Sequence, residues 1–206
     1  ADGRYEFSAL AGGDFAVEVL PSGLPFGATP TFDPDGVNTP GAFAVTLSCG
    51  EELTDQNFGY KPYFLGQTYC SPASPNSTGG PGEISASGSV VTAQNDVVLF
   101  CSSLPSNQFG YFLTSMTPGF LPNPAGSQGN LCVLGDIGRY IGPGQVQNSG
   151  LLGLVSLTIN LDQMPRPTGP MAVQPGDTWF FQFWHRDGSS SGPVSNMTDA
   201  LRIQFQ

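Results

Sequence analysis

Apolar and polar residues alternate along several short stretches of the chain, and a period of two is typical of β-strands with one buried face. In the first part of the chain, strands are expected at 5–9, 14–19 and 43–47. A helical period never persists for three turns. The pattern therefore predicts an all-β protein.

The rest of the chain predicts a larger set of strands, separated by turns rich in Gly and Pro. Residues 179–184 place aromatic side chains on both faces, which predicts a central strand covered on both sides. This set of strands fits a β-sandwich of the jelly-roll type. The expected strands are 83–91, 96–103, 109–116, 130–134, 151–161, 177–186 and 199–206.

The first strands have one apolar face and no partner layer, and so small a sheet is not stable alone. We therefore expect either that the chain was cut from a longer protein or that something else supplies the missing strands. The predicted organisation is a partial module at 1–60, a linker at 61–66 and a β-sandwich module at 67–206.

Four spaced segments carry a family resemblance: DGRYEFSAL, GGDFAVEVLPSG, TFDPDGVNTPG and VTLSCGEELTDQNFGY. Their order resembles the C-terminal half of an SdrD B-like (Cna-B-like) domain, a small β-sandwich module of secreted bacterial surface proteins. The calcium loop with which such domains open is not among the matched segments, so its calcium role is not carried over. The resemblance implies a partial sandwich in an extracellular or cell-surface protein.

Residues 66–206 are similar to a β-rich C-terminal module of large secreted proteins from planctomycete-like bacteria. The segments that carry this resemblance are YCSPASPNSTG, LPSNQFGYFLTS, GSQGNLCVLGDIGRY and the stretch 184–187. It implies a secreted location and no particular chemistry.

The charge of the chain is low in density and uneven. Charged residues make up 11% of the sequence, and the net charge is −10. Residues 1–60 hold nine acidic residues against one basic residue, Arg4. An acidic surface repels phosphate backbones, which argues against nucleic-acid binding. No apolar run approaches the length of about 18 residues that a membrane span needs.

The four cysteines favour disulfides, because an even number in a chain of secreted character is typical of that chemistry. No CxxC spacing is present, and one histidine cannot complete a Cys/His zinc site. We expect Cys70 to pair with Cys132 inside the second module, and Cys49 with Cys101 between the modules. Other connectivities, or four buried free thiols, are the alternatives.

One acidic loop is a candidate calcium site. Asp33, Asp35 and Asn38 could place side-chain oxygens around a hard cation. No Glu follows at the spacing of a complete calcium loop. An ordinary Asp-Gly turn is the alternative that the pattern favours.

Catalytic chemistry has little support in the sequence. His185 is the only histidine, and Asp187 lies two residues further along the same predicted strand. Such neighbours share a face and do not indicate a catalytic triad. No nucleophile elbow of the form GxSxG is present. We therefore predict a protein that is not an enzyme.

Exposed aromatic and polar side chains could bind a sugar. The candidates are Trp184, Tyr111, Tyr140 and Arg139, and core packing is the alternative for the aromatic ones.

Asn76 and Asn196 begin N-x-S/T sequences and are candidate glycosylation sites in predicted loops.

Two classes of function follow from these expectations. The first is a structural subunit or stalk of an extracellular filament or adhesin. A neighbouring chain, or the parent polypeptide, would complete its first module by β-strand addition at the open sheet edge of residues 1–20. The second is a carbohydrate-binding module of a larger secreted protein. A secreted hydrolase is a weaker third hypothesis.

Overall fold

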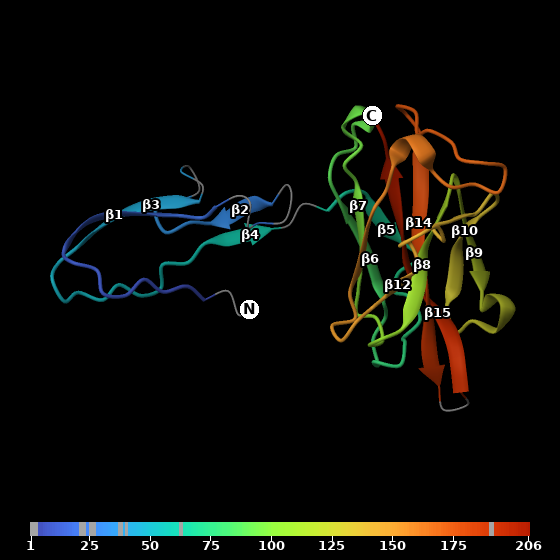
Figure 1. Cartoon of the computed structure of the whole chain (residues 1–206), viewed down its shortest axis with the longest axis horizontal. Coiled ribbons are helices and arrows are strands. Elements are labelled where there is room, and N and C mark those ends of the chain that lie inside the picture. The colour runs from blue at the N-terminus through green and yellow to red at the C-terminus, as the bar shows by residue number, and fades with distance from the viewer. Residues whose placement is uncertain are drawn as a thin grey trace. The chain divides into compact units, whose positions relative to one another are not determined.

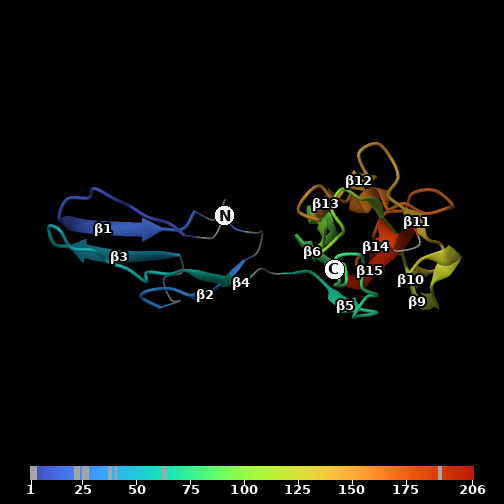
Figure 2. The same cartoon turned by 90° about the horizontal axis from the view of Figure 1, so that it is seen from below.

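A computed structural model describes residues 4–20, 24, 28–36, 39, 41–61, 64–189 and 192–206. The chain divides into two compact units, Ala1–Tyr63 (unit 1) and Phe64–Gln206 (unit 2). Strands are the main regular secondary structure of both units, and the predicted all-β class is confirmed (Figures 1 and 2). The described helical turns are three short 3₁₀ turns, η2 (Thr92–Gln94), η3 (Pro124–Gly126) and η4 (Leu161–Gln163). No helix in these ranges has the length and apolar character to cross a membrane.

Unit 1 contains two antiparallel pairs of strands. One pair is β1 (Gly13–Glu18) with β3 (Ala42–Leu47), and the other is β2 (Thr29–Phe32) with β4 (Gly59–Lys61). In the first pair, Phe15 lies opposite Val45 and Val17 opposite Phe43, so these apolar side chains share one face. Within the described part of unit 1, β1 and β3 pair only with each other. Neither outer edge of this sheet is paired with another described strand.

The strand predicted at 5–9 is not present, and residues 4–11 form an irregular segment instead. Ala9 has a φ of 60°, in the left-handed region, which interrupts an extended backbone. The Tyr5 hydroxyl donates a hydrogen bond to the carbonyl of Gln56, so this segment is attached to the residues that precede β4. The open edge that was expected over 1–20 therefore belongs to β1 alone.

Unit 2 is a sandwich of a large and a small sheet, with a third layer outside the large one. The large sheet has the order β11-β8-β14-β15-β5, and β12 also pairs with β8. The small sheet has the order β13-β7-β6, and β9 with β10 forms a two-stranded outer ribbon. The strands are β5 (Gln67–Tyr69), β6 (Glu83–Ser87), β7 (Val98–Ser102), β8 (Phe109–Ser115), β9 (Thr117–Pro122), β10 (Asn130–Leu134), β11 (Gly138–Arg139), β12 (Gln147–Asn148), β13 (Val155–Thr158), β14 (Thr178–Ser189) and β15 (Gly192–Gln204).

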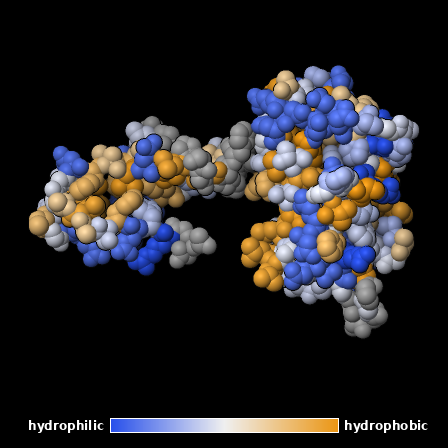
Figure 3. All heavy atoms as spheres, viewed as in Figure 1, coloured by the Kyte–Doolittle hydropathy of each residue, from blue (hydrophilic) through white to orange (hydrophobic). Residues whose placement is uncertain are grey.

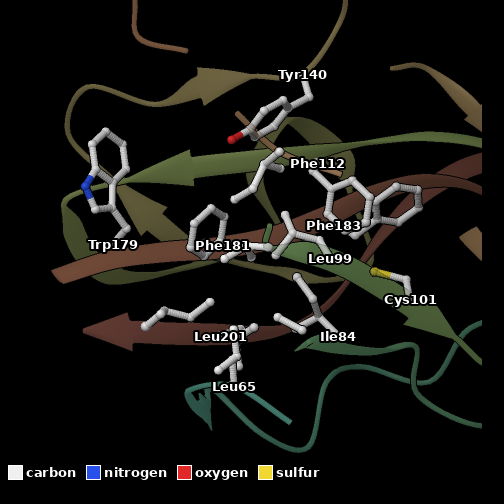
Figure 4. Close-up of a cluster of buried hydrophobic side chains, with 14 of the residues drawn as sticks. Leu65, Ile84, Leu99, Cys101, Phe112, Tyr140, Trp179, Phe181, Phe183 and Leu201 are labelled. Atoms are coloured by element: carbon white, nitrogen blue, oxygen red, sulfur yellow. The ribbon is translucent and has the colours of Figure 1, made fainter. Parts of the chain in front are cut away.

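β14 is the central strand of unit 2 and is covered on both faces, as its sequence predicts. Trp179, Phe181 and Phe183 are fully buried in the main core between the two sheets (Figure 4). On the other face, Phe180 is buried in a second cluster that includes residues of the β9–β10 ribbon. The aromatic residues between 179 and 184 therefore contribute to two hydrophobic clusters, one on each face of β14.

Several boundaries differ from the predicted ones. β13 begins only at Val155, because residues 150–153 form a turn in which Gly150 and Gly153 have positive φ. The predicted linker also ends earlier, because Leu65 is buried in the main core and its backbone N–H donates to the Ala86 carbonyl at 2.7 Å.

Candidate functional site

Unit 1 contains a hollow of about 700 Å³ beneath the apolar face of the β1–β3 pair. Side chains of the two strands form its floor, and the irregular segments 4–11, 48 and 50–57 form its walls. Figure 1 shows the segment after the N-terminus running alongside the segment that leads into β4. The floor consists of Phe15, Val17, Phe43, Val45 and Leu47. We call this space the unit 1 hollow.

The floor of the unit 1 hollow is incompletely covered. Phe43 is buried, whereas Phe15, Val17, Val45 and Leu47 are only half-buried. A sheet face in a finished sandwich is normally closed by a second layer, because each exposed apolar group costs free energy in water. The irregular walls supply only part of that layer.

One end of the hollow is closed by aromatic contacts, and its walls are acidic. The ring centroids of Phe43 and Phe58 lie 5.7 Å apart, and those of Tyr5 and Phe58 lie 6.4 Å apart. Glu6 and the acidic residues of 51–55 line the space, together with Arg4. The hollow therefore suits an apolar segment that is uncharged or cationic better than an anionic one.

The predicted Cys70–Cys132 disulfide is present in unit 2. It links two residues 62 positions apart, with Cα atoms separated by 6.4 Å. Cys70 directly follows the edge strand β5, and Cys132 lies within β10 of the outer ribbon. The bridge therefore attaches the ribbon to the sheet that it covers.

The predicted Cys49–Cys101 bridge is wrong, because both residues are free thiols. Cys101 lies on β7 in the main core and is 1% exposed (Figure 4). Burial, with a smaller contribution from Asp199, raises its pKa well above the ordinary value. Cys49 is exposed at a turn of unit 1. A thiol enclosed in a packed core cannot reach such a partner.

In the candidate calcium loop, both described carboxylates already bind the loop itself. The Asp33 side chain is buried, and its Oδ2 accepts a hydrogen bond from the Gly41 N–H at 2.7 Å. The Asp35 carboxylate accepts one from the Thr39 hydroxyl at 2.9 Å. Asn38 lies outside the described residues. Within those residues, no group of three metal-binding side chains is found, and calcium binding stays a prediction.

The candidate glycosylation sites are buried in unit 2. The Asn76 amide donates to the Ser103 carbonyl at 2.7 Å, and the Asn196 amide donates to the Pro75 carbonyl at 3.0 Å. Asn196 is fully buried in β15, so the expected loop is a strand at that position. A glycan needs a free amide nitrogen at the surface, and neither residue offers one in the folded chain.

His185 and Asp187 are buried in unit 2 and contact the backbone of neighbouring residues. The Asp187 carboxylate accepts hydrogen bonds from the backbone N–H groups of Ser77 and Gly188. His185 is 1% exposed, and its Nδ1 lies 3.0 Å from the Arg186 carbonyl oxygen. Burial lowers the pKa of His185 and favours the neutral ring. Asp187 therefore fixes the loop that follows Cys70.

The structure separates the sugar-binding candidates. Tyr111 and Trp184 lie opposite each other on β8 and β14, half-buried, with ring centroids 5.0 Å apart. Tyr140 is 3% exposed and donates to the Met164 sulfur, so its assignment as a sugar ligand is wrong. Arg139 is exposed on β11. A sugar role stays a prediction for the Tyr111–Trp184 pair.

The most exposed apolar feature of unit 2 was missed in the sequence. Leu151 and Leu152 are each 82% exposed, in a stretch that was predicted to be strand. The flanking Gly150 and Gly153 are the signal that could have found this turn. Residues 50–57, which form part of the wall of the unit 1 hollow, contain no comparable sequence signal from which their position could have been predicted.

A buried carboxyl makes the stability of unit 2 depend on pH. Burial raises the pKa of Asp199 to about 6, and the nearby Glu83 carboxylate contributes to the shift. The folded state therefore keeps a proton between pH ~4 and pH ~6 that the unfolded state releases, and stability is lost as pH rises through this window. We expect Asp199→Asn to stabilise unit 2 by about 1 kcal/mol at pH 7, after allowance for solvent screening.

Urea denaturation at several pH values measures this effect. At pH ~2.5 the variant and the wild type should be equally stable, because Asp199 is then protonated in both the folded and the unfolded wild type. Glu83→Gln should give a smaller change of the same sign. A stability difference that does not vary with pH would contradict the assignment.

Comparison with known protein families, with characterised proteins and with solved structures gives no match to this chain. The fold and the disulfide define the class of protein, which is an all-β chain of two units with a bridged sandwich as the second unit.

Proposed function

We propose that this chain is a non-enzymatic structural subunit of an extracellular or cell-surface filament, stalk or adhesin. An apolar segment of a neighbouring chain or of the parent polypeptide completes its first unit. The observation that carries the proposal is the unit 1 hollow, in whose floor four of the five strand side chains are only half-buried. Filling this space with an apolar segment would remove that floor from water.

The open edges of the β1–β3 sheet support the same function. Each edge presents backbone N–H and C=O groups that an added strand can pair. The resemblance of residues 1–60 to part of an SdrD B-like domain agrees with a unit of this kind. So does the disulfide of unit 2, because such bonds persist in oxidising surroundings.

Val17→Asp tests this function, because it places a carboxylate on the floor of the hollow. We expect the dissociation constant for self-association to rise on the order of tenfold or more, since a buried unpaired charge is costly. Ala16→Asp is the matched control, because Ala16 is exposed on the opposite face of β1. Sedimentation velocity over a range of concentrations measures both variants against the wild type.

Leu53→Asp provides a second variant if Val17→Asp disturbs the fold of unit 1. Leu53 lines the hollow and is 44% exposed, so its replacement leaves the strands intact. It should weaken association in the same way. A wild type that stays monomeric at every concentration, or variants that associate like the wild type, would argue against assembly of identical chains through the hollow.

A further inference from the structure

The loop between β12 and β13 is an apolar projection on unit 2. Leu151 and Leu152 are 82% exposed and Leu154 is 52% exposed. Figure 3 shows hydrophobic atoms projecting at the edge of unit 2 where Figure 1 places the loop after β12. We call residues 149–154 the leucine loop. Large apolar side chains grouped this way at a surface mark an interaction site.

Hydrogen bonds hold the leucine loop in one conformation. The Gly150 carbonyl accepts from the Asn107 N–H at 2.8 Å, and the Gly153 carbonyl accepts from the Leu104 N–H at 3.1 Å. Gly153 has a φ of 65°, and a side chain there would meet the Leu104 carbonyl oxygen. The loop is thus fixed by its backbone while the side chains of its leucines face water. A partner would bind it without the cost of ordering a flexible segment.

The leucine loop also carries no charge. Between Arg139 and Asp162 the sequence has no acidic or basic residue. The walls of the unit 1 hollow are acidic, so a segment that carries carboxylates would be repelled there. An uncharged apolar loop avoids this repulsion, so its charge and polarity match those of the hollow.

We infer that the leucine loop of one copy docks into the unit 1 hollow of a second copy. This inference rests on the proposed function and names the segment that fills the hollow. Every copy carries both a loop and a hollow, so the contact joins two different surfaces. Contacts of this kind generate rings or open filaments instead of closing at a twofold dimer. The leucine loop therefore links subunits head to tail.

Mixing two variants tests this pairing. Leu152→Asp should prevent the leucine loop from docking, and Leu53→Asp should prevent the unit 1 hollow from accepting a loop. Each variant alone should lose self-association on the order of tenfold or more, since it removes one leucine from the contact and places a carboxylate there. An equimolar mixture retains one intact loop and one intact hollow, so it should form a 1:1 heterodimer and nothing larger. Sedimentation velocity with one variant fluorescently labelled distinguishes these species.

The matched control for the loop is Thr158→Asp, an exposed position on β13 outside the loop. It should associate like the wild type. If Leu53→Asp abolishes association and Leu152→Asp does not, the docking inference is overturned while the proposed function stands. If neither variant has an effect, both fail.

A membrane surface is the other apolar environment that could receive two exposed leucines. Vesicles of phosphatidylcholine test this alternative. If the wild type sediments with the vesicles, and Leu152→Asp abolishes this binding but leaves self-association unchanged, the leucine loop binds lipid and docking between copies is overturned. Formation of the heterodimer in the mixture of variants, without binding of the wild type to vesicles, supports docking between copies.

Discussion

Replacing Cys70 and Cys132 together by serine should lower the free energy of unfolding of unit 2 by about 4 kcal/mol. The bridge closes a loop of 62 residues, and the loss of its restraint on the unfolded chain accounts for most of this value. In the folded state, the bridge attaches the outer ribbon to the large sheet. We expect the ribbon to separate first when the bridge is removed.

Tryptophan fluorescence during urea denaturation measures this loss for unit 2 alone. Both tryptophans of the chain, Trp179 and Trp184, lie on β14. Cys49→Ser is the control, because Cys49 is a free exposed thiol and its replacement should change stability by less than about 0.5 kcal/mol. Equal denaturation midpoints for the wild type and the double variant would show that the bridge does not stabilise the fold.

Gln182→Leu should destabilise unit 2 by about 3 kcal/mol, although the two side chains are similar in size. Gln182 is fully buried at the centre of β14. Its Oε1 accepts from the Cys132 N–H at 2.8 Å, and its Nε2 donates to the carbonyls of Asn130 at 2.8 Å and Thr198 at 2.9 Å. Leucine would leave these three backbone groups buried without partners, at about 1 kcal/mol or more each.

The amide of Gln182 is required because strand pairing is irregular on both sides of it. The β9–β10 register shifts between Leu131 and Val133, and the β14–β15 register shifts between Gln182 and Trp184. Gln204→Leu is the matched control, since Gln204 is exposed on β15. If the two leucine variants unfold at the same urea concentration, the hydrogen bonds of Gln182 contribute nothing measurable to stability.

The central strand and the disulfide could be predicted because each depends on a property of the chain itself. A run that is apolar on both faces requires cover on both sides, and β14 has it. Cys70 and Cys132 lie in one module, and they are bridged. The second pairing failed because a thiol's partner depends on where it points, and Cys101 points into the main core.

The irregular segments could not be predicted from the alternation of residues. Residues 5–9 alternate like a strand, yet Ala9 adopts a left-handed conformation. β9 was missed because its Pro118, Gly119 and Pro122 disfavour strands, and it forms only by pairing with β10. Asn196 matched an acceptor sequence, but it lies buried in β15. Contacts with distant segments decide the outcome at β9 and at Asn196.

The sequence by itself determined that the chain is all-β and that β14 lies at the centre of unit 2. These properties follow from the period and amount of apolar residues along the chain. Only the tertiary structure decided where apolar surface stays open, namely the unit 1 hollow and the leucine loop. Exposure depends on contacts between segments far apart in sequence, and these contacts cannot be predicted from local periodicity.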